Sequence, residues 1–149
     1  MKQLPDAAFN PILKLDTQFC FSVYALSRLI TKAYQPLLES LEVTYPQYLV
    51  LLLLWENDGL TVKQLSEKLL LDSGTLTPLL KRMEGHQWLS RRRAPHDERS
   101  VLVELQPAGR ALQWKAQEIP VRVAERLQMA PPELDALRAQ LRHLITLLT

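Results

Sequence analysis

The spacing of the apolar residues changes along this chain from a helical repeat to an alternating repeat and back, and this change restricts the fold most. From Leu15 to Met83, apolar residues recur every three or four positions, which is the spacing of one face of a helix. From Trp88 to Leu105 the spacing is mainly two, as in a strand. The helical spacing returns after Pro107. The chain is therefore predicted to be mainly α-helical, with one small β-hairpin.

The first part of the chain predicts two helices joined by a short loop. Apolar residues over 15–41 mark a long helix, which Pro36 is expected to kink or break near residues 34–35. Thr44-Tyr45-Pro46-Gln47 has the capping-box pattern, with proline in the first turn, and predicts a helix over about 45–56. Because its run from Leu49 to Trp55 is apolar on all sides, this helix is expected to be central and buried.

A short helix, a turn, a second helix and a hairpin are predicted next. Thr61 repeats the capping signal for the short helix, and the second helix is predicted over about 73–84, with Gly85 as its C-cap. The strands are predicted over 88–93 and 99–105, joined by a polar turn. This order is typical of a winged helix-turn-helix, in which the second helix enters the major groove of DNA.

Two further helices are predicted after the hairpin. Pro107 begins one that is expected to run to about Ile119, where Pro120 disturbs it. The last helix begins at Pro131 and carries leucines close to a heptad seam: Leu134, Leu137, Leu141, Leu144 and Leu148.

Basic residues are concentrated around the hairpin. The whole chain has a net charge of +2, whereas the segment from Lys81 to Arg99 contains six basic and three acidic residues. The predicted helix before it begins with small hydroxyl side chains, which allow close approach to phosphates. A basic patch on a nearly neutral body is typical of a DNA-binding protein. The candidate contacts in this pattern are Ser73, Thr75, Thr77, Lys81, Arg82 and Arg91.

The same residues also have purely structural interpretations. Ser73 and Thr75 could serve only as helix caps. Residues 91–93 could form a solvated strand edge that prevents aggregation.

Length and composition exclude several classes of protein. The 149 residues suit one domain. The single cysteine excludes a disulfide within one chain and a four-cysteine zinc site. The longest apolar run, from Tyr48 to Trp55, has eight residues, against about 20 for a membrane span. Because residues 1–11 also lack a signal-peptide pattern, a cytoplasmic protein without membrane contact is expected. The spacing of the three histidines suits no metal site, and no cofactor is expected.

The lone cysteine, Cys20, stands between two phenylalanines, and Tyr24 follows one helical turn later. Tyr34 is 14 positions further on, which is about 21 Å along a helix, so it cannot contact Cys20 in the same helix. The two side chains could meet if two such helices packed antiparallel in a homodimer. A phenol donating to the sulfur would favour the thiolate, which would attack an apolar peroxide. An inert, buried cysteine is the alternative interpretation.

Several motifs together resemble the MarR family of dimeric winged-helix repressors, and within it the one-cysteine type of organic hydroperoxide resistance regulator. The motifs lie between about Leu15 and Leu105, and the Asp-x-Arg pattern of the hairpin is shared widely in the family. They are Phe19-Cys20-Phe21 with Tyr24, Ala33-Tyr34-Gln35-Pro36-Leu37-Leu38, Thr44-Tyr45-Pro46-Gln47-Tyr48, Leu71-Asp72-Ser73-Gly74-Thr75-Leu76-Thr77-Pro78 and Asp97-Glu98-Arg99-Ser100.

The resemblance implies a role for each matching residue. Cys20 would be the peroxide sensor, and Tyr34 and Tyr45 would hydrogen-bond it across the dimer, with Tyr24 nearby. Residues 72–81, beginning at Asp72, would form the recognition helix. In the wing, Arg99 would enter the minor groove, Asp97 would brace the loop, and Arg91 would contact the DNA backbone.

The resemblance also implies an organisation, partners and a chemical route. Residues 12–42 and 107–149 would form the dimerisation helices, and residues 44–105 the DNA-binding lobe of a single domain. The partners would be operator DNA, a second copy of the chain and an organic hydroperoxide. Because the C-terminal half has no second cysteine, oxidised Cys20 would react with a low-molecular-weight thiol or be over-oxidised.

Two alternatives remain open at this point. A small aromatic acid, instead of cysteine oxidation, could release such a repressor from DNA. The chain could also be a thiol peroxidase. The sequence disfavours an enzyme, because no second cysteine is present and the histidines lie far along the chain from Cys20.

Overall fold

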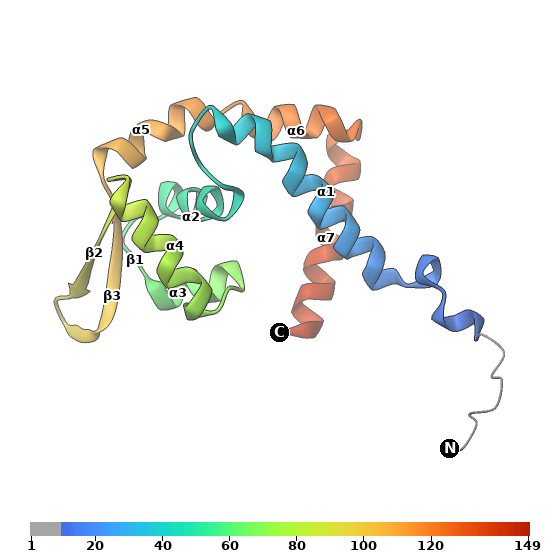
Figure 1. Ribbon diagram of the computed structural model, residues 1–149, viewed down its shortest axis with the longest axis horizontal. Helices are drawn as coiled ribbons and strands as arrows, with labels where there is room; N and C mark the ends of the chain where they lie inside the picture. The colour runs from blue at the N-terminus through green and yellow to red at the C-terminus, as the bar shows by residue number, and fades with distance from the viewer. Residues whose placement is uncertain (1–9) are drawn as a thin grey trace, which may run out of the picture.

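The computed structural model describes residues 10–149, and Figure 1 shows a helical protein with one small sheet. This confirms the predicted fold class. Two 3-10 turns, Pro11–Leu13 and Leu15–Thr17, precede seven α-helices and three strands. The elements are, in order, α1 (Phe19–Glu39), α2 (Tyr45–Glu56), β1 (Leu60–Thr61), α3 (Val62–Leu69), α4 (Ser73–Gly85), β2 (Leu89–Ala94), β3 (Asp97–Leu105), α5 (Pro107–Ala116), α6 (Ile119–Leu127) and α7 (Pro131–Leu148).

The core is built around α2, as its apolar sequence predicts. Val50, Leu51 and Leu54 of α2 are buried and belong to one cluster with residues of α3, α4 and β3. The expected burial of the whole run holds only in part, because Leu52 is exposed and Leu49, Leu53 and Trp55 are half-buried. The capping boxes at both helix starts are confirmed, since Gln47 accepts from the Thr44 N–H at 2.9 Å and Gln64 accepts from the Thr61 N–H at 2.8 Å. These local bonds fix where α2 and α3 begin.

The sheet has three antiparallel strands in the order β1-β3-β2. The β2–β3 hairpin confirms the predicted wing, and Val103 and Leu105 point into the core. The sequence interpretation missed β1, which pairs Leu60 and Thr61 with Val103 and Leu102. A strand of two residues is too short for an alternating pattern to be visible.

Three predicted features are wrong in detail. Of the two outcomes predicted at Pro36, a kink or a break, the break does not occur: α1 continues to Glu39, since a proline removes only one helical hydrogen bond. Gly85 belongs to α4 and does not cap it; the chain reverses at Gln87, which has φ of 59°. The helix beginning at Pro107 ends at Ala116.

A separate helix, α6, follows the end of α5 and was not predicted. Pro120 lies in the first turn of α6. A proline without an N–H is tolerated there, so it begins this helix instead of disturbing the previous one.

The molecule has two parts, one containing α3, α4 and the hairpin and the other containing the N-terminal half of α1 with α7 (Figure 1). The N-terminal half of α1 and the whole of α7 lie away from α3, α4 and the hairpin. Many apolar side chains there are exposed in the single protomer, including Phe19, Leu26, Leu29, Leu147 and Leu148. No helix among residues 10–149 is long and apolar enough to cross a membrane.

A tightly packed junction connects the hairpin to α5. The Trp55 indole N–H donates to the Gly109 carbonyl at 3.0 Å, and Asp58 accepts from the Leu105 N–H at 2.8 Å. Asp58 also pairs with Arg110. The end of α2 therefore holds the end of β3 and the start of α5 together.

Candidate functional site

Asp72 organises the start of α4. Its carboxylate accepts from the Thr75 N–H at 2.8 Å and from the Thr75 hydroxyl at 2.9 Å. These hydrogen bonds to the charged form hold the pKa of Asp72 below its usual value. The Thr75 hydroxyl is therefore engaged within the turn, although Thr75 is exposed, as are Ser73 and Thr77.

A groove of about 450 Å³ lies between α3, the first turns of α4 and the sheet. Polar and basic side chains from these elements line it, among them Lys63, Ser73, Thr77, Arg91 and Arg99. The structure thus brings predicted residues of α4 and of the wing to one surface. Lys63 was not selected from the sequence, because the charge count began at Lys81.

The basic side chains fall into paired and unpaired groups. Arg91 binds Glu84 through Nε at 3.1 Å and Nη2 at 2.8 Å, and Arg92 binds Glu104 at 2.6 and 2.8 Å. Arg91 lowers the pKa of Glu84, so this pair is ionised at neutral pH. By contrast, Lys81, Arg82 and Arg99 are exposed and form no salt bridge with another described residue.

Asp97 braces the tip of the hairpin. Its carboxylate accepts from the Arg99 N–H at 3.0 Å and from the Ser100 hydroxyl at 2.6 Å. Both bonds lower the pKa of Asp97 below its usual value. The turn is therefore ordered by a carboxylate that stays ionised, with the Arg99 side chain left exposed.

Cys20 is exposed in the first turn of α1. The neighbouring Phe19 and Tyr24 are also exposed, and the Tyr24 hydroxyl accepts from Arg28 at 2.9 Å. Within one protomer Cys20 is thus a surface residue among uncovered aromatic side chains, in contrast to the inert buried interpretation.

Tyr34 and Tyr45 lie together between α1 and α2. Their ring centroids are 4.8 Å apart, and Tyr48 lies 6.0 Å from Tyr34 and 6.5 Å from Tyr45. Burial raises the pKa of all three phenols, to about 12 for Tyr48. They therefore remain protonated and able to donate at neutral pH. The sequence does not distinguish Tyr48 from a core residue, because a buried tyrosine on an apolar helix fits the same pattern.

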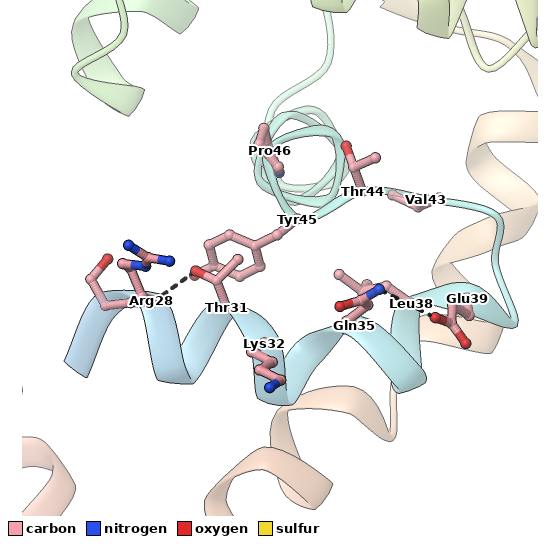
Figure 2. Close-up of a pocket in the computed structure, with 11 residues that line it drawn as sticks. Arg28, Thr31, Lys32, Gln35, Leu38, Glu39, Val43, Thr44, Tyr45 and Pro46 are labelled. Carbon is pink, nitrogen blue, oxygen red and sulfur yellow. Dashed lines mark hydrogen bonds between the residues drawn. The ribbon is translucent and has the colours of Figure 1, made fainter. Parts of the chain in front are cut away.

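A pocket of about 630 Å³ lies beside Tyr45, between α1 and the start of α2 (Figure 2). Thr31, Gln35 and Leu38 line it from α1, and Pro46 lines it from α2. Figure 2 shows the Tyr45 ring directed toward α1, with Lys32 turned away from α2. No group of three or more His, Cys, Asp or Glu side chains within residues 10–149 is placed to hold a metal ion.

The MarR family profile matches residues 43–101, which include α2 to most of β3. The chain is 50% identical over 133 residues to an organic hydroperoxide resistance transcriptional regulator of Bacillus subtilis, covering 89% of this chain and 90% of that protein. This chain belongs to the MarR family. Two solved structures support the assignment, both of AbfR. The overoxidised protein bound to DNA has a TM-score of 0.73 at 34% identity, over 91% of this chain and 95% of the other. AbfR of Staphylococcus epidermidis has a TM-score of 0.70 at 34% identity, over 89% and 94%.

The MarR fold explains which predicted residues come together in this chain and which do not. Ser73, Thr77, Arg91 and Arg99 share one groove, and Tyr34 meets Tyr45. Cys20 lies on the same helix as Tyr34 but about 21 Å along its axis. Within one protomer, Cys20 and the Tyr34–Tyr45 pair are therefore both present but do not contact each other.

Proposed function

We propose that this chain is a homodimeric transcriptional repressor that binds a pseudo-palindromic operator and releases it when an organic hydroperoxide oxidises Cys20. The observation that carries the proposal is the exposed Cys20 on an uncovered aromatic and apolar face of α1. The same chain presents a DNA-binding type of groove between α4 and the wing. The relationship to a hydroperoxide resistance regulator supports the choice of signal.

Residues 44–105 form the DNA-binding lobe in this proposal. Helix α4 enters the major groove with Ser73, Thr75 and Thr77 at its leading end, and Lys81 and Arg82 contact phosphates. Arg99 at the wing enters the minor groove. Arg91 lines the protein groove between α4 and the wing and contacts the DNA backbone, although its Nε and Nη2 are already bonded to Glu84. The recognition helices of the two subunits lie one DNA turn apart, about 34 Å.

Residues 12–42 and 107–149 form the dimerisation part. The apolar side chains that α1 and α7 expose in one protomer would be covered by the same surface of a second copy. Antiparallel packing of the two α1 helices places Cys20 near Tyr34 and Tyr45 of the other subunit. The neutral phenols then donate to the thiolate.

Oxidation removes the thiolate that the tyrosine hydroxyls bind. The thiolate sulfur attacks the terminal oxygen of the hydroperoxide, the O–O bond breaks, and the departing alkoxide takes a proton from water to leave as an alcohol. Cys20 becomes a sulfenic acid. A low-molecular-weight thiol then forms a mixed disulfide with release of water, because the chain has no second cysteine.

The energy required for release is small. A hundredfold loss of operator affinity corresponds to about 2.7 kcal/mol. Hydrogen bonds to a charged group contribute about 1.5–3 kcal/mol each. Loss of two tyrosine bonds to the sulfur is therefore sufficient to repack the helices and change the half-site spacing. Release of the operator requires only one oxidation of each Cys20, so the proposal does not call for catalytic turnover of the peroxide.

Release by a small aromatic acid is the second candidate, favoured by the pocket beside Tyr45. Thr31, Tyr45 and Pro46 line this pocket, with Arg28 at one end and Glu39 at the other (Figure 2). A gel-shift titration of wild-type protein with cumene hydroperoxide, combined with mass spectrometry of Cys20, tests the leading proposal. Operator release without any mass change on Cys20 would favour the second candidate.

Replacement of Arg99 with alanine tests the wing. We expect operator binding to weaken about tenfold and the salt dependence to flatten by about two in slope for the dimer, because each subunit loses one phosphate-proximal charge. Arg122→Ala, an exposed arginine of α6 outside the lobe, is the matched control. Unchanged affinity and slope for the Arg99 variant would remove this residue from the interface.

A further inference from the structure

Three residues of α1 follow one another at helical spacing on one face: Cys20, Tyr24 and Arg28. The Arg28 Nη1 donates to the Tyr24 hydroxyl at 2.9 Å, and the guanidinium carbon lies 5.5 Å from the Tyr24 ring centroid. The Tyr24 side chain is 58% exposed, so packing in the protomer does not fix it. In the protomer, Arg28 is the residue that positions this phenol.

We propose that Arg28 is a positioning residue for the reaction of Cys20 with hydroperoxide, acting through Tyr24. The inference rests on the proposed function, in which Cys20 reacts with the peroxide. Arg28 is distinct from the cysteine and the tyrosines of the proposed sensor.

The hydrogen-bond inventory of a phenol explains the effect. A tyrosine hydroxyl has one proton to donate and lone pairs that accept. Because Arg28 occupies an acceptor site, the proton of Tyr24 is directed to another partner. A bond from a cationic donor also polarises the hydroxyl and makes it a stronger donor.

Tyr24 is one turn after Cys20, and long side chains on a helix lean toward the preceding turn. At this spacing the polarised phenol is one helical turn from the sulfur and can reach it, although in the protomer its hydroxyl bonds Arg28 and not Cys20. Within reach of the sulfur it can stabilise the thiolate and the negative charge that moves to the departing oxygen when the O–O bond breaks. Tyr24 keeps its own proton, and water protonates the alkoxide.

The contribution of the pair to folding is expected to be small. Exposed pairs at i, i+4 stabilise a helix only weakly. Substitutions of Arg28 should therefore leave a folded dimer. Lys32 provides a matched control, because it lies one turn further along α1 and points away from α2 (Figure 2).

The test measures the second-order rate of Cys20 oxidation by cumene hydroperoxide in full-length, reduced protein. We expect Arg28→Gln to slow the reaction about tenfold, Arg28→Lys to restore most of the rate, and Lys32→Gln to match wild type. Tyr24→Phe should slow the reaction to a similar extent, and Arg28→Gln should add nothing in the Tyr24→Phe background. Melting temperatures confirm that the variants fold.

Two results would overturn the inference: a wild-type rate in Arg28→Gln, or an equal loss caused by Arg28→Gln with and without the Tyr24 hydroxyl. A third result separates this inference from the proposed function. If Cys20 of the wild-type protein does not react with the peroxide, the proposed function itself fails, and the role of Arg28 fails with it.

Discussion

Cys20→Ser is expected to bind the operator with the affinity of the reduced wild-type protein and to remain bound when an organic hydroperoxide is added. Serine is close to cysteine in size, and position 20 is exposed in the protomer, so the substitution should not disturb the lobe that contacts DNA. The hydroxyl cannot be oxidised to a sulfenic acid. We therefore expect the hundredfold or larger loss of affinity in the wild-type protein to disappear completely.

A gel shift with and without cumene hydroperoxide measures this difference. The matched control is wild-type protein treated with the corresponding alcohol, which lacks the reactive O–O bond. If Cys20→Ser dissociates from the operator on peroxide treatment as the wild-type protein does, Cys20 is not the sensor. Release of that variant by an aromatic acid would then support the pocket beside Tyr45 as the site of the signal.

Among the four glycines, Gly109 is the one whose replacement by alanine is expected to cost the most stability. Gly109 is buried in the first turn of α5. An added Cβ would collide with the carbonyl oxygen of Trp88 and lie 2.9 Å from its carbonyl carbon and 3.1 Å from a Leu105 methyl. Backbone cannot move aside as a flexible side chain can, so the cost should reach about 3 kcal/mol.

Thermal unfolding measures this cost, with an expected decrease in melting temperature of about 6–12 °C. Gly85→Ala is the control, because an added Cβ at that helical position meets no atom within 4 Å. The control should be neutral or stabilising by up to about 1 kcal/mol. If the Gly109 variant were as stable as wild type, α5 would be able to move away from the Trp88 backbone without cost, and the prediction would be wrong.

The DNA-binding face was predicted only in part from the sequence. Counting charges identified the basic segment, but Arg92 is paired with Glu104, which lies outside that segment. Arg91 is paired with Glu84 within it. A charge count cannot show which cations are neutralised, because a strand brings together residues that are distant in the chain.

Element boundaries set by nearby residues are predicted from the sequence, whereas those set by distant residues are not. The starts of α2 and α3 were predicted well, since the hydrogen bonds of Thr44 and Thr61 reach residues only three positions away. The two-residue strand β1 was missed because its partner is β3, more than 40 positions later. Helix α6 is not predicted, because a proline can either end a helix or stand in the first turn of the next one, and the sequence does not show which applies to Pro120.

The amino-acid order alone determined the helical class, the hairpin, the capped helix starts and the solitary thiol, because each depends on periodicity, capping or residue identity within a few positions. Only the tertiary structure decided which hydroxyls and arginines share the groove, that Tyr34, Tyr45 and Tyr48 form one cluster, and that Cys20 is exposed with Tyr24 held by Arg28. Those arrangements depend on packing between helices and on side-chain conformation. A linear pattern records neither, since the same spacing fits a buried core residue and an uncovered interface residue equally well.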